Sequence, residues 1–284
     1  MTEALANLLL MMDLEATGPD TFRGLGPGGS RRRMFGGHVA GQALMAAGRT
    51  LSGLPAHSLH AYFLRPGDPN QSSDFRVERV RDGKSFATRL VTASQQGEPI
   101  LTASVSFHAA ERGFEHQKAM PQVKPPEACI SWDDWMGPRL AQLSPEARAQ
   151  MVRERPIELR PIDPIAMRDP VPSGRFQHFW CRASGQVPDD ALLQQAVATY
   201  ASDHALLSAV MRPHGRTFLS QGIMAASLDH SIWFHRPFKI DAWLLYAHET
   251  PAAFGARGLS FGHFFDQQGV LVASTAQEGL VRER

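Results

Sequence analysis

The sequence predicts an α+β fold in which one unit, a helix followed by an antiparallel run of strands, occurs twice. The first observation is that short motifs recur in the same order, 170 to 172 residues apart. The recurring motifs are "FLRP" and "FHRP" (ending at Pro66 and Pro237), "QQG" (95–97 and 267–269), and the Ala-Ser pair of "LTASVSF" (101–107) and "LVASTAQ" (271–277). Three matches at nearly one spacing indicate a duplicated unit.

The second observation is that both copies have the same order of predicted elements. Each begins with apolar residues at helical spacing, in 36–51 and in 189–211. Strand-like segments separated by turn signals follow, and "QQGEP" and "DQQG" are matching hairpin turns. The predicted strands are 58–66, 74–81, 85–95 and 99–109 in the first copy, and 225–236, 242–250, 255–265 and 270–281 in the second. A helix with an antiparallel run of strands, made twice, is an α+β plan.

Between the copies lies a proline-rich connector. Ten of the twenty prolines fall in 121–172, and proline cannot donate to a sheet ladder, so no central strand is expected there. Ser144 followed by Pro145 predicts the start of one short helix. We therefore expect three parts: an N-terminal unit (1–115), an ordered connector (116–172) and a C-terminal unit (173–284).

Composition sets the class of protein. With 284 residues, 43% hydrophobic and 20% charged, the chain can bury one large core or two ordinary ones. A net charge of +1 gives no support for a nucleic-acid surface, and no stretch approaches the roughly 18 apolar residues that cross a membrane. The start, "MTEALANLLLMMDLE", predicts an amphipathic helix rather than a secretory signal. Cys129 and Cys181 have neither metal-ligand nor disulfide-scaffold spacing, so we expect a cytoplasmic protein.

Several familiar patterns are set aside. "GLGPGG" (24–29) matches the dinucleotide-binding pattern G-x-G-x-x-G but lacks a βαβ context. "GLSFG" (258–262) matches the nucleophile-elbow pattern of serine hydrolases but lies in a predicted strand, so Ser260 is not a serine nucleophile. His230 and His235 are five apart on a strand and point to opposite faces, which makes a shared metal site poor geometry. The arginines 31–33 are expected on a solvated face, with contact to a phosphate-bearing ligand as the alternative.

Five motifs in fixed order carry a resemblance to a known family. They are "FGGHVAGQAL", "YFLRPGD", "YASDHALL", "LDHSIWFHRPF" and "LVASTAQEG". With them the whole chain, from "ALANLL" to "QEGLVR", resembles acyl-CoA thioesterase II, the double-hotdog branch of the hotdog-fold thioesterases. The resemblance implies two tandem hotdog units, each a long helix wrapped by a curved antiparallel β-sheet. It also implies hydrolysis of fatty acyl-CoA to free acid and CoA without cofactor or metal, in a homo-oligomer (dimer or tetramer).

The resemblance also implies a catalytic set of Asp, Ser or Thr, and Gln from the second unit. These fall on Asp203 of "ASD", Ser227 (where threonine is commoner) and Gln277 of "QEG". An aspartate can take a proton from water or attack the thioester directly, while neutral hydroxyl and amide groups hold the water. Backbone N–H groups at a helix N-terminus are expected to stabilise the oxyanion, with the glycines of "FGGH" admitting substrate.

The repeat places Phe107 of the first copy near Gln277 of the second, so the polar additions lie in the copy expected to be catalytic. Asp229, His230 and Arg236 are expected to be structural, with a role for His230 in catalysis as the alternative. Medium- to long-chain acyl-CoA is the expected substrate. Two other functions stay open: a hotdog enoyl-CoA hydratase using Asp203 and His204, and a non-catalytic acyl-CoA-binding protein.

Overall fold

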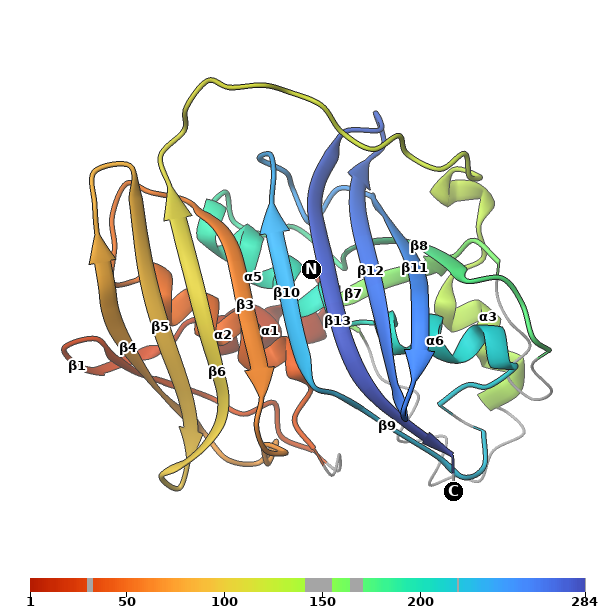
Figure 1. Ribbon diagram of the computed structural model, residues 1–284, viewed down its shortest axis with the longest axis horizontal. Helices are drawn as coiled ribbons and strands as arrows, with labels where there is room; N and C mark the ends of the chain where they lie inside the picture. Colours follow the sequence, from red (N-terminus) through yellow and green to blue (C-terminus); the bar gives the residue numbers. More distant parts are fainter. Residues whose placement is uncertain (30–32, 141–154, 164–170, 219, 284) are drawn as a thin grey trace.

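A computed structural model describes residues 1–29, 33–140, 155–163, 171–218 and 220–283. Within these residues, 13 strands form one antiparallel sheet, in the order β1-β2-β4-β5-β6-β3-β10-β13-β12-β11-β8-β7, with β9 paired to β13 (Figure 1). The strands are β1 (Glu15–Gly18), β2 (Thr21–Gly24), β3 (Ala56–Phe63), β4 (Ser73–Asp82), β5 (Phe86–Gln95), β6 (Glu98–His108), β7 (Ile157–Pro161), β8 (Phe176–Ala183), β9 (Ile223–Ser227), β10 (Asp229–Phe234), β11 (Leu244–Phe254), β12 (Arg257–Asp266) and β13 (Leu271–Glu283). The helices are α1 (Glu3–Met12), α2 (Gly36–Gly48), η1 (Pro126–Ala128), α3 (Trp132–Leu140), α5 (Ala191–Ser202), α6 (Leu206–Met211) and η2 (Arg212–His214). The predicted α+β class is confirmed.

The two copies meet at the antiparallel pair of β3 and β10. His60 pairs with Ser231 across this junction, and their side chains are in contact, with His60 Nδ1 3.0 Å from Ser231 Oγ. These two residues are 171 apart, which is the spacing of the repeat. The approximate two-fold axis of the duplication therefore passes between β3 and β10, and the strand order β4-β5-β6-β3 of the first half is matched by β11-β12-β13-β10 in the second.

Helices α2 and α5 pack against each other behind this sheet (Figure 1). Every residue of α2 from Gly37 to Ala47 is buried, because the sheet covers one side of the helix and α5 the other. Two glycines permit the close approach: a Cβ on Gly37 would lie 2.5 Å from the Tyr200 carbonyl oxygen, and one on Gly41 3.0 Å from that of Ala196. Small residues thus bring the start of α2 to the end of α5.

The helix predicted over 189–211 is interrupted, and this expectation of one continuous helix was wrong. Helix α5 begins after Asp190, whose side chain accepts the N–H of Leu193, and it ends at Ser202. Ala205 then has a left-handed backbone (φ 68°), after which α6 begins. An alanine pattern carries no signal for this break, because alanine is a strong helix former.

The strand predicted over 225–236 is likewise two strands. Leu228 separates β9 from β10, and the Asp229 carboxylate accepts the Glu278 N–H at 2.7 Å. A side-chain oxygen thus replaces a backbone carbonyl as the acceptor in the ladder, so β9 does not have to continue in line with β10. The alternation was correctly predicted, since His230, Ile232 and Phe234 are buried.

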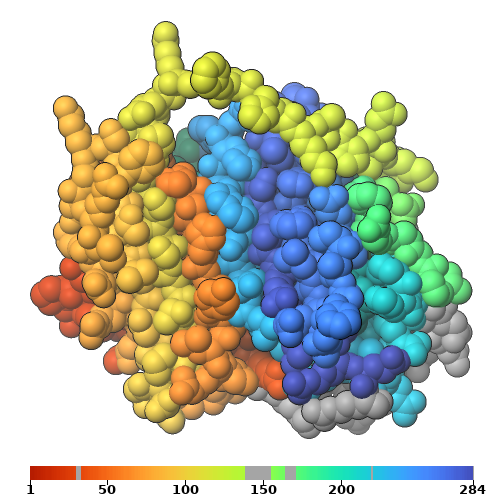
Figure 2. All heavy atoms as spheres, viewed as in Figure 1, coloured from red at the N-terminus to blue at the C-terminus, as the bar shows by residue number. Residues whose placement is uncertain are grey.

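The remaining elements extend the sheet at its edges. The strands β1, β2, β7 and β8 were not predicted, and β7 lies inside the proline-rich connector as an edge strand that ends at Pro161. The segment after β6 crosses the strand ends (Figure 2), where Gln117 bonds the backbone of Gly269 and Leu271. The helix predicted at Ser144 lies outside the described residues. Helix α1 forms as predicted, and no helix in the described ranges has the length and apolarity needed to span a membrane.

Candidate active site

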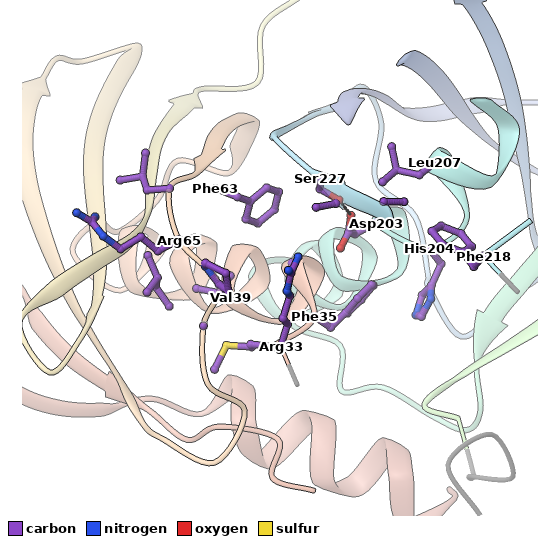
Figure 3. A pocket seen from close by; sticks show the side chains of 18 of the residues that line it. Arg33, Phe35, Val39, Phe63, Arg65, Asp203, His204, Leu207, Phe218 and Ser227 are labelled. Carbon is purple, nitrogen blue, oxygen red and sulfur yellow. Dashed lines mark hydrogen bonds between the residues drawn. The ribbon is translucent and has the colours of Figure 1, made fainter. Parts of the chain in front are cut away.

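A cavity of about 700 Å³ opens between the two halves (Figure 3). Both halves line it: the first contributes Arg33, Phe35, Val39, Phe63 and Arg65, and the second contributes Asp203, His204, Leu207, Phe218 and Ser227. Most of this wall is apolar, with a few polar groups converging at Asp203. This is the usual composition of a small-molecule site, for which volumes of roughly 300–1,000 Å³ are typical.

Asp203 lies at the C-terminal cap of α5, at the break before α6. The carboxylate also lies at the N-terminus of α2, where the Gly37 N–H donates to Oδ2 at 2.8 Å. A negative charge is favoured at this end of a helix. The glycines of "FGGH" were expected to admit substrate, but the group they admit here is Asp203: a Cβ on Gly36 would lie 2.8 Å from its Oδ2.

The three residues predicted for catalysis come together at this point. Gln277 in β13 donates from Nε2 to Asp203 Oδ1 at 2.9 Å, and also to Ser227 Oγ. The Ser227 hydroxyl, at the end of β9, lies 3.4 Å from the same Oδ1. Asp203 and Ser227 reach the cavity, whereas Gln277 is only 1% exposed and lies behind them. Its amide hydrogens are directed to protein atoms rather than to a water site.

Burial raises the pKa of Asp203, because removal from water disfavours the carboxylate. Three hydrogen-bond donors oppose this shift and keep the pKa from rising further: the Gly37 N–H and the side chains of Gln277 and Ser227. A carboxylate held by several donors, with a pKa above its ordinary value, is a stronger base than a free aspartate. This cluster can therefore take a proton from a water in the cavity.

The register between strands corrects one equivalence. Phe107 was expected to correspond to Gln277, but β3 pairs Leu59 with Val105, and β10 pairs Ser231 with Ala276. One step further along the pairing of β10 with β13, Gln277 lies opposite His230. These two residues therefore correspond to Val105 and Leu59 of the first half, in that order. The repeat motifs differ in spacing by up to two residues, which accounts for the error.

Sequence reasoning missed two groups at the site: the Gly37 amide and the Ser202 hydroxyl, which lies 2.7 Å from His230 Nε2. The double glycine at the predicted helix start was a signal for the Gly37 amide, whereas a single serine in a helix gives no signal for the Ser202 hydroxyl. The His204 ring stacks on Phe35, with centroids 4.6 Å apart, and points away from the Asp203 carboxylate (Figure 3).

The patterns set aside earlier have ordinary places in the fold. Ser260 is fully buried in β12, where its hydroxyl donates to the Leu206 carbonyl at 2.9 Å. His230 is buried and His235 faces outward to Ser274. Arg31 and Arg32 lie outside the described residues, and Arg33 lines the cavity. No group of three or more His, Cys, Asp or Glu side chains is placed to hold a metal ion in the described part of the chain.

Comparison with known proteins then decides the family. The chain is 38% identical to acyl-CoA thioesterase 2 of Haemophilus influenzae, over 99% of both chains. It is 39% identical to human acyl-coenzyme A thioesterase 8, over 96% of this chain and 88% of that one. The protein belongs to the acyl-CoA thioesterase family.

Each half of this thioesterase-family chain also matches its own family model. Residues 27–108 match the acyl-CoA thioesterase N-terminal domain, and residues 162–280 match acyl-CoA thioesterase. The crystal structure of an acyl-CoA thioesterase II from Mycobacterium marinum is 37% identical, with a TM-score of 0.78 over 99% of this chain and 98% of that one. These matches confirm the resemblance seen in the sequence, the hotdog fold, and the predicted enzyme class of acyl-CoA thioester hydrolase.

Proposed function

We propose that the protein hydrolyses medium- to long-chain fatty acyl-CoA to free fatty acid and CoA, with Asp203, Ser227 and Gln277 as its working site. The observation that carries this proposal is that Asp203 and Ser227 line a largely apolar cavity and that Gln277, directly behind them, is hydrogen-bonded to both. The C-terminal hotdog supplies all three. The N-terminal hotdog supplies the helix N-terminus that holds the carboxylate.

In the proposed reaction, Asp203 accepts a proton from a water that Ser227 helps to hold in the cavity. The water oxygen bonds to the thioester carbonyl carbon, the carbon–sulfur bond then breaks, and the proton on Asp203 passes to the departing CoA thiolate. Gln277 fixes Asp203 and Ser227 relative to each other, so the reacting groups are held in place before the substrate arrives. Positioning of this kind lowers the entropic part of the barrier.

The lining of the cavity supports the proposed substrate class. Val39, Phe63 and Ile100 offer an apolar surface for an acyl chain. Arg33 and Arg65 supply positive charge on the side of the first half, suited to the phosphates of CoA (Figure 3). Arg65 also bonds the Pro99 carbonyl at 2.9 Å and pairs with Glu98 at 3.3 Å, which holds its guanidinium at this rim.

A hydratase would use Asp203 with His204, but the stacking of His204 on Phe35 turns that ring from the carboxylate. A binding protein would need no base, yet a carboxylate with a raised pKa lines this cavity. Hydrolysis accounts for both observations.

A thiol-release assay across acyl-CoA chain lengths tests the proposal. We expect free CoA to appear with medium- and long-chain substrates, without added metal and equally in EDTA. Loss of activity in EDTA that zinc restores would contradict a cofactor-free reaction. Turnover confined to short acyl chains would contradict the substrate class alone.

A further inference from the structure

A chain of buried side chains continues from the site into the core of the second half. His230 in β10 is fully buried, with Nδ1 3.2 Å from Gln277 Oε1 and Nε2 2.7 Å from Ser202 Oγ. Ser202 is the last residue of α5, directly before Asp203. The side chains therefore form a loop that leaves Asp203 through Gln277 and His230 and returns to the chain beside Asp203.

The Asp203 carboxylate fixes the direction of the other hydrogen bonds in this loop. The Asp203 carboxylate only accepts, so the Gln277 amide must present its nitrogen to it, and its oxygen then faces His230. An amide oxygen also only accepts, so His230 must carry a proton on Nδ1. In a neutral ring Nε2 then carries no proton and accepts a hydrogen bond from the Ser202 hydroxyl.

The surroundings of His230 favour this neutral ring. Burial lowers its pKa, against the opposing charges of Asp203 and Asp229 and the bond to Gln277. A protonated ring would need two acceptors, and the Ser202 hydroxyl would then have to donate to the Thr199 carbonyl, 2.9 Å away. Both arrangements keep Nδ1–H on the amide oxygen, but only in the neutral ring does the Ser202 hydroxyl donate to Nε2 instead of to the Thr199 carbonyl.

We propose that His230 is a positioning residue, whose Nδ1–H holds the Gln277 amide with its nitrogen toward Asp203, while the Ser202 hydroxyl selects the Nδ1–H tautomer. The proposal rests on the proposed function of Asp203 and goes beyond it. His230 is sealed from the cavity, so it acts through Gln277. Without it the amide is free to turn over and place its oxygen against the carboxylate, where two acceptors repel each other.

The first half supplies the matched substitution. Leu59 is fully buried at the strand position equivalent to His230, so His230→Leu places a side chain that the duplicated unit already accommodates. We expect His230→Leu to lower kcat about 10–100-fold with KM nearly unchanged, which is the usual effect of removing a group that orients a functional side chain. The acid limb of the pH–rate profile moves to higher pH, because Asp203 loses an oriented donor and its pKa rises.

His230→Asn is the conservative control. The asparagine Nδ2, like Nδ1 of histidine, is bonded to Cγ, so it keeps a donor near the Gln277 oxygen and restores most of kcat. Ser202→Ala removes the hydroxyl that faces Nε2, together with its contact to the Thr199 carbonyl, and lowers kcat less than His230→Leu. A structural role alone predicts the reverse: loss of folded protein, no shift of the acid limb and no rescue by asparagine. His230→Leu at the parent rate, with an unshifted profile, overturns the proposal.

A spectroscopic test observes the His230 ring of the parent protein directly. The ring ¹⁵N signals of histidine distinguish Nδ1–H from Nε2–H, and a His230 substitution identifies the signal among the twelve histidines. Nδ1–H on a neutral ring is expected, and Nε2–H in the parent protein overturns the proposal. The rate of Asp203→Asn in the kinetic assay distinguishes failure of the proposed function from failure of the role of His230. If it retains the parent rate, the proposed site is wrong, whereas an inactive Asp203→Asn beside a fully active His230→Leu refutes only the role of His230.

Discussion

At equivalent strand positions the first half buries Leu59 beside Val105, and the second half buries His230 beside Gln277. The helices differ in the same way. Helix α2 ends at Gly48 and reaches β3 through residues 49–55, whereas α5 ends at Ser202 and reaches β10 through 203–222 and β9. The second connection contains the helix break, α6 and the strand that carries Ser227. One scaffold thus carries an apolar core in one copy and, with a longer connection, a polar site in the other.

The two halves differ in whether these buried strand positions hold polar side chains. Buried polar groups stabilise a fold only when every one is hydrogen-bonded, and unpaired ones cost about 1–3 kcal/mol each. The cluster at the site of the second half meets this condition with a closed set of partners, whereas the first half has the aliphatic Leu59 and Val105 at the equivalent strand positions. Substitutions that exchange residues between the two halves therefore test which polar groups the site needs.

Removing the base should have the largest effect. Asp203→Asn keeps the size of the side chain but cannot take a proton, so kcat should fall by about 10²–10⁴, or about 3–5 kcal/mol of barrier, with KM changed far less. Steady-state kinetics across substrate concentrations measures both, and circular dichroism checks the fold. In the parent enzyme the raised pKa of Asp203 means that kcat/KM should fall with acid at a higher pH than a free aspartate would give.

Giving the second half the residue of the first should come next. Gln277→Val copies Val105, removes the donor to Asp203 and Ser227, and should lower kcat about 10–100-fold. The acid limb should also move to higher pH, since the lost amide no longer opposes the rise in the pKa of Asp203. A pH–rate profile of the variant checks both effects. The combined Asp203→Asn and Gln277→Val losses should be smaller than their product, because both act on one proton transfer.

The Ser227 hydroxyl should matter less than the Gln277 amide, since its 3.4 Å contact with Asp203 is the longest in the cluster. Ser227→Ala should lower kcat, but by less than Gln277→Val, while Ser227→Thr keeps the hydroxyl and should remain near the parent rate. Kinetic constants for the pair measure the effect of the hydroxyl alone. An inactive threonine variant that folds normally would show that the wall has no room for a methyl group.

Placing a histidine in the first half should affect stability and spare activity. Leu59→His buries an imidazole among aliphatic residues without the amide and hydroxyl that His230 has, so we expect a loss of about 1–3 kcal/mol in the free energy of unfolding. Chemical denaturation measures it, and kcat should stay within a few-fold of the parent. Unchanged stability would mean that the first half tolerates a buried polar side chain as readily as the second.

The smallest effect is expected at Ser260. Ser260→Ala loses one buried hydrogen bond to the Leu206 carbonyl, worth about 1 kcal/mol, and leaves kcat within a few-fold. Melting temperature and kcat measure the two quantities. A folded but inactive Ser260→Ala would revive the serine-hydrolase interpretation of "GLSFG".

The residue patterns predicted the duplicated α+β plan and most strands of both halves, and the resemblance to the thioesterase family predicted the residues that meet at the site. These predictions were possible because strand alternation and hairpin turns are local signals, and because motif order is preserved. The sequence missed the breaks at Ala205 and Leu228, which depend on tertiary contacts: the Asp229 carboxylate replaces a backbone acceptor only when β13 lies beside it. It also missed the Gly37 amide at Asp203, since nothing local joins residues 166 apart in the chain.

The pairing of His60 with Ser231 at the junction has a consequence for how such a site can arise. Two identical units joined through this pair would form a symmetric dimer, in which any residue chosen for one site must also appear at the other. Joining the units in one chain removes that obligation, so one position can hold leucine while its mate holds histidine. The buried polar chain then occurs once per pair of units. The first half contributes an apolar core and the N-terminus of α2, which faces Asp203.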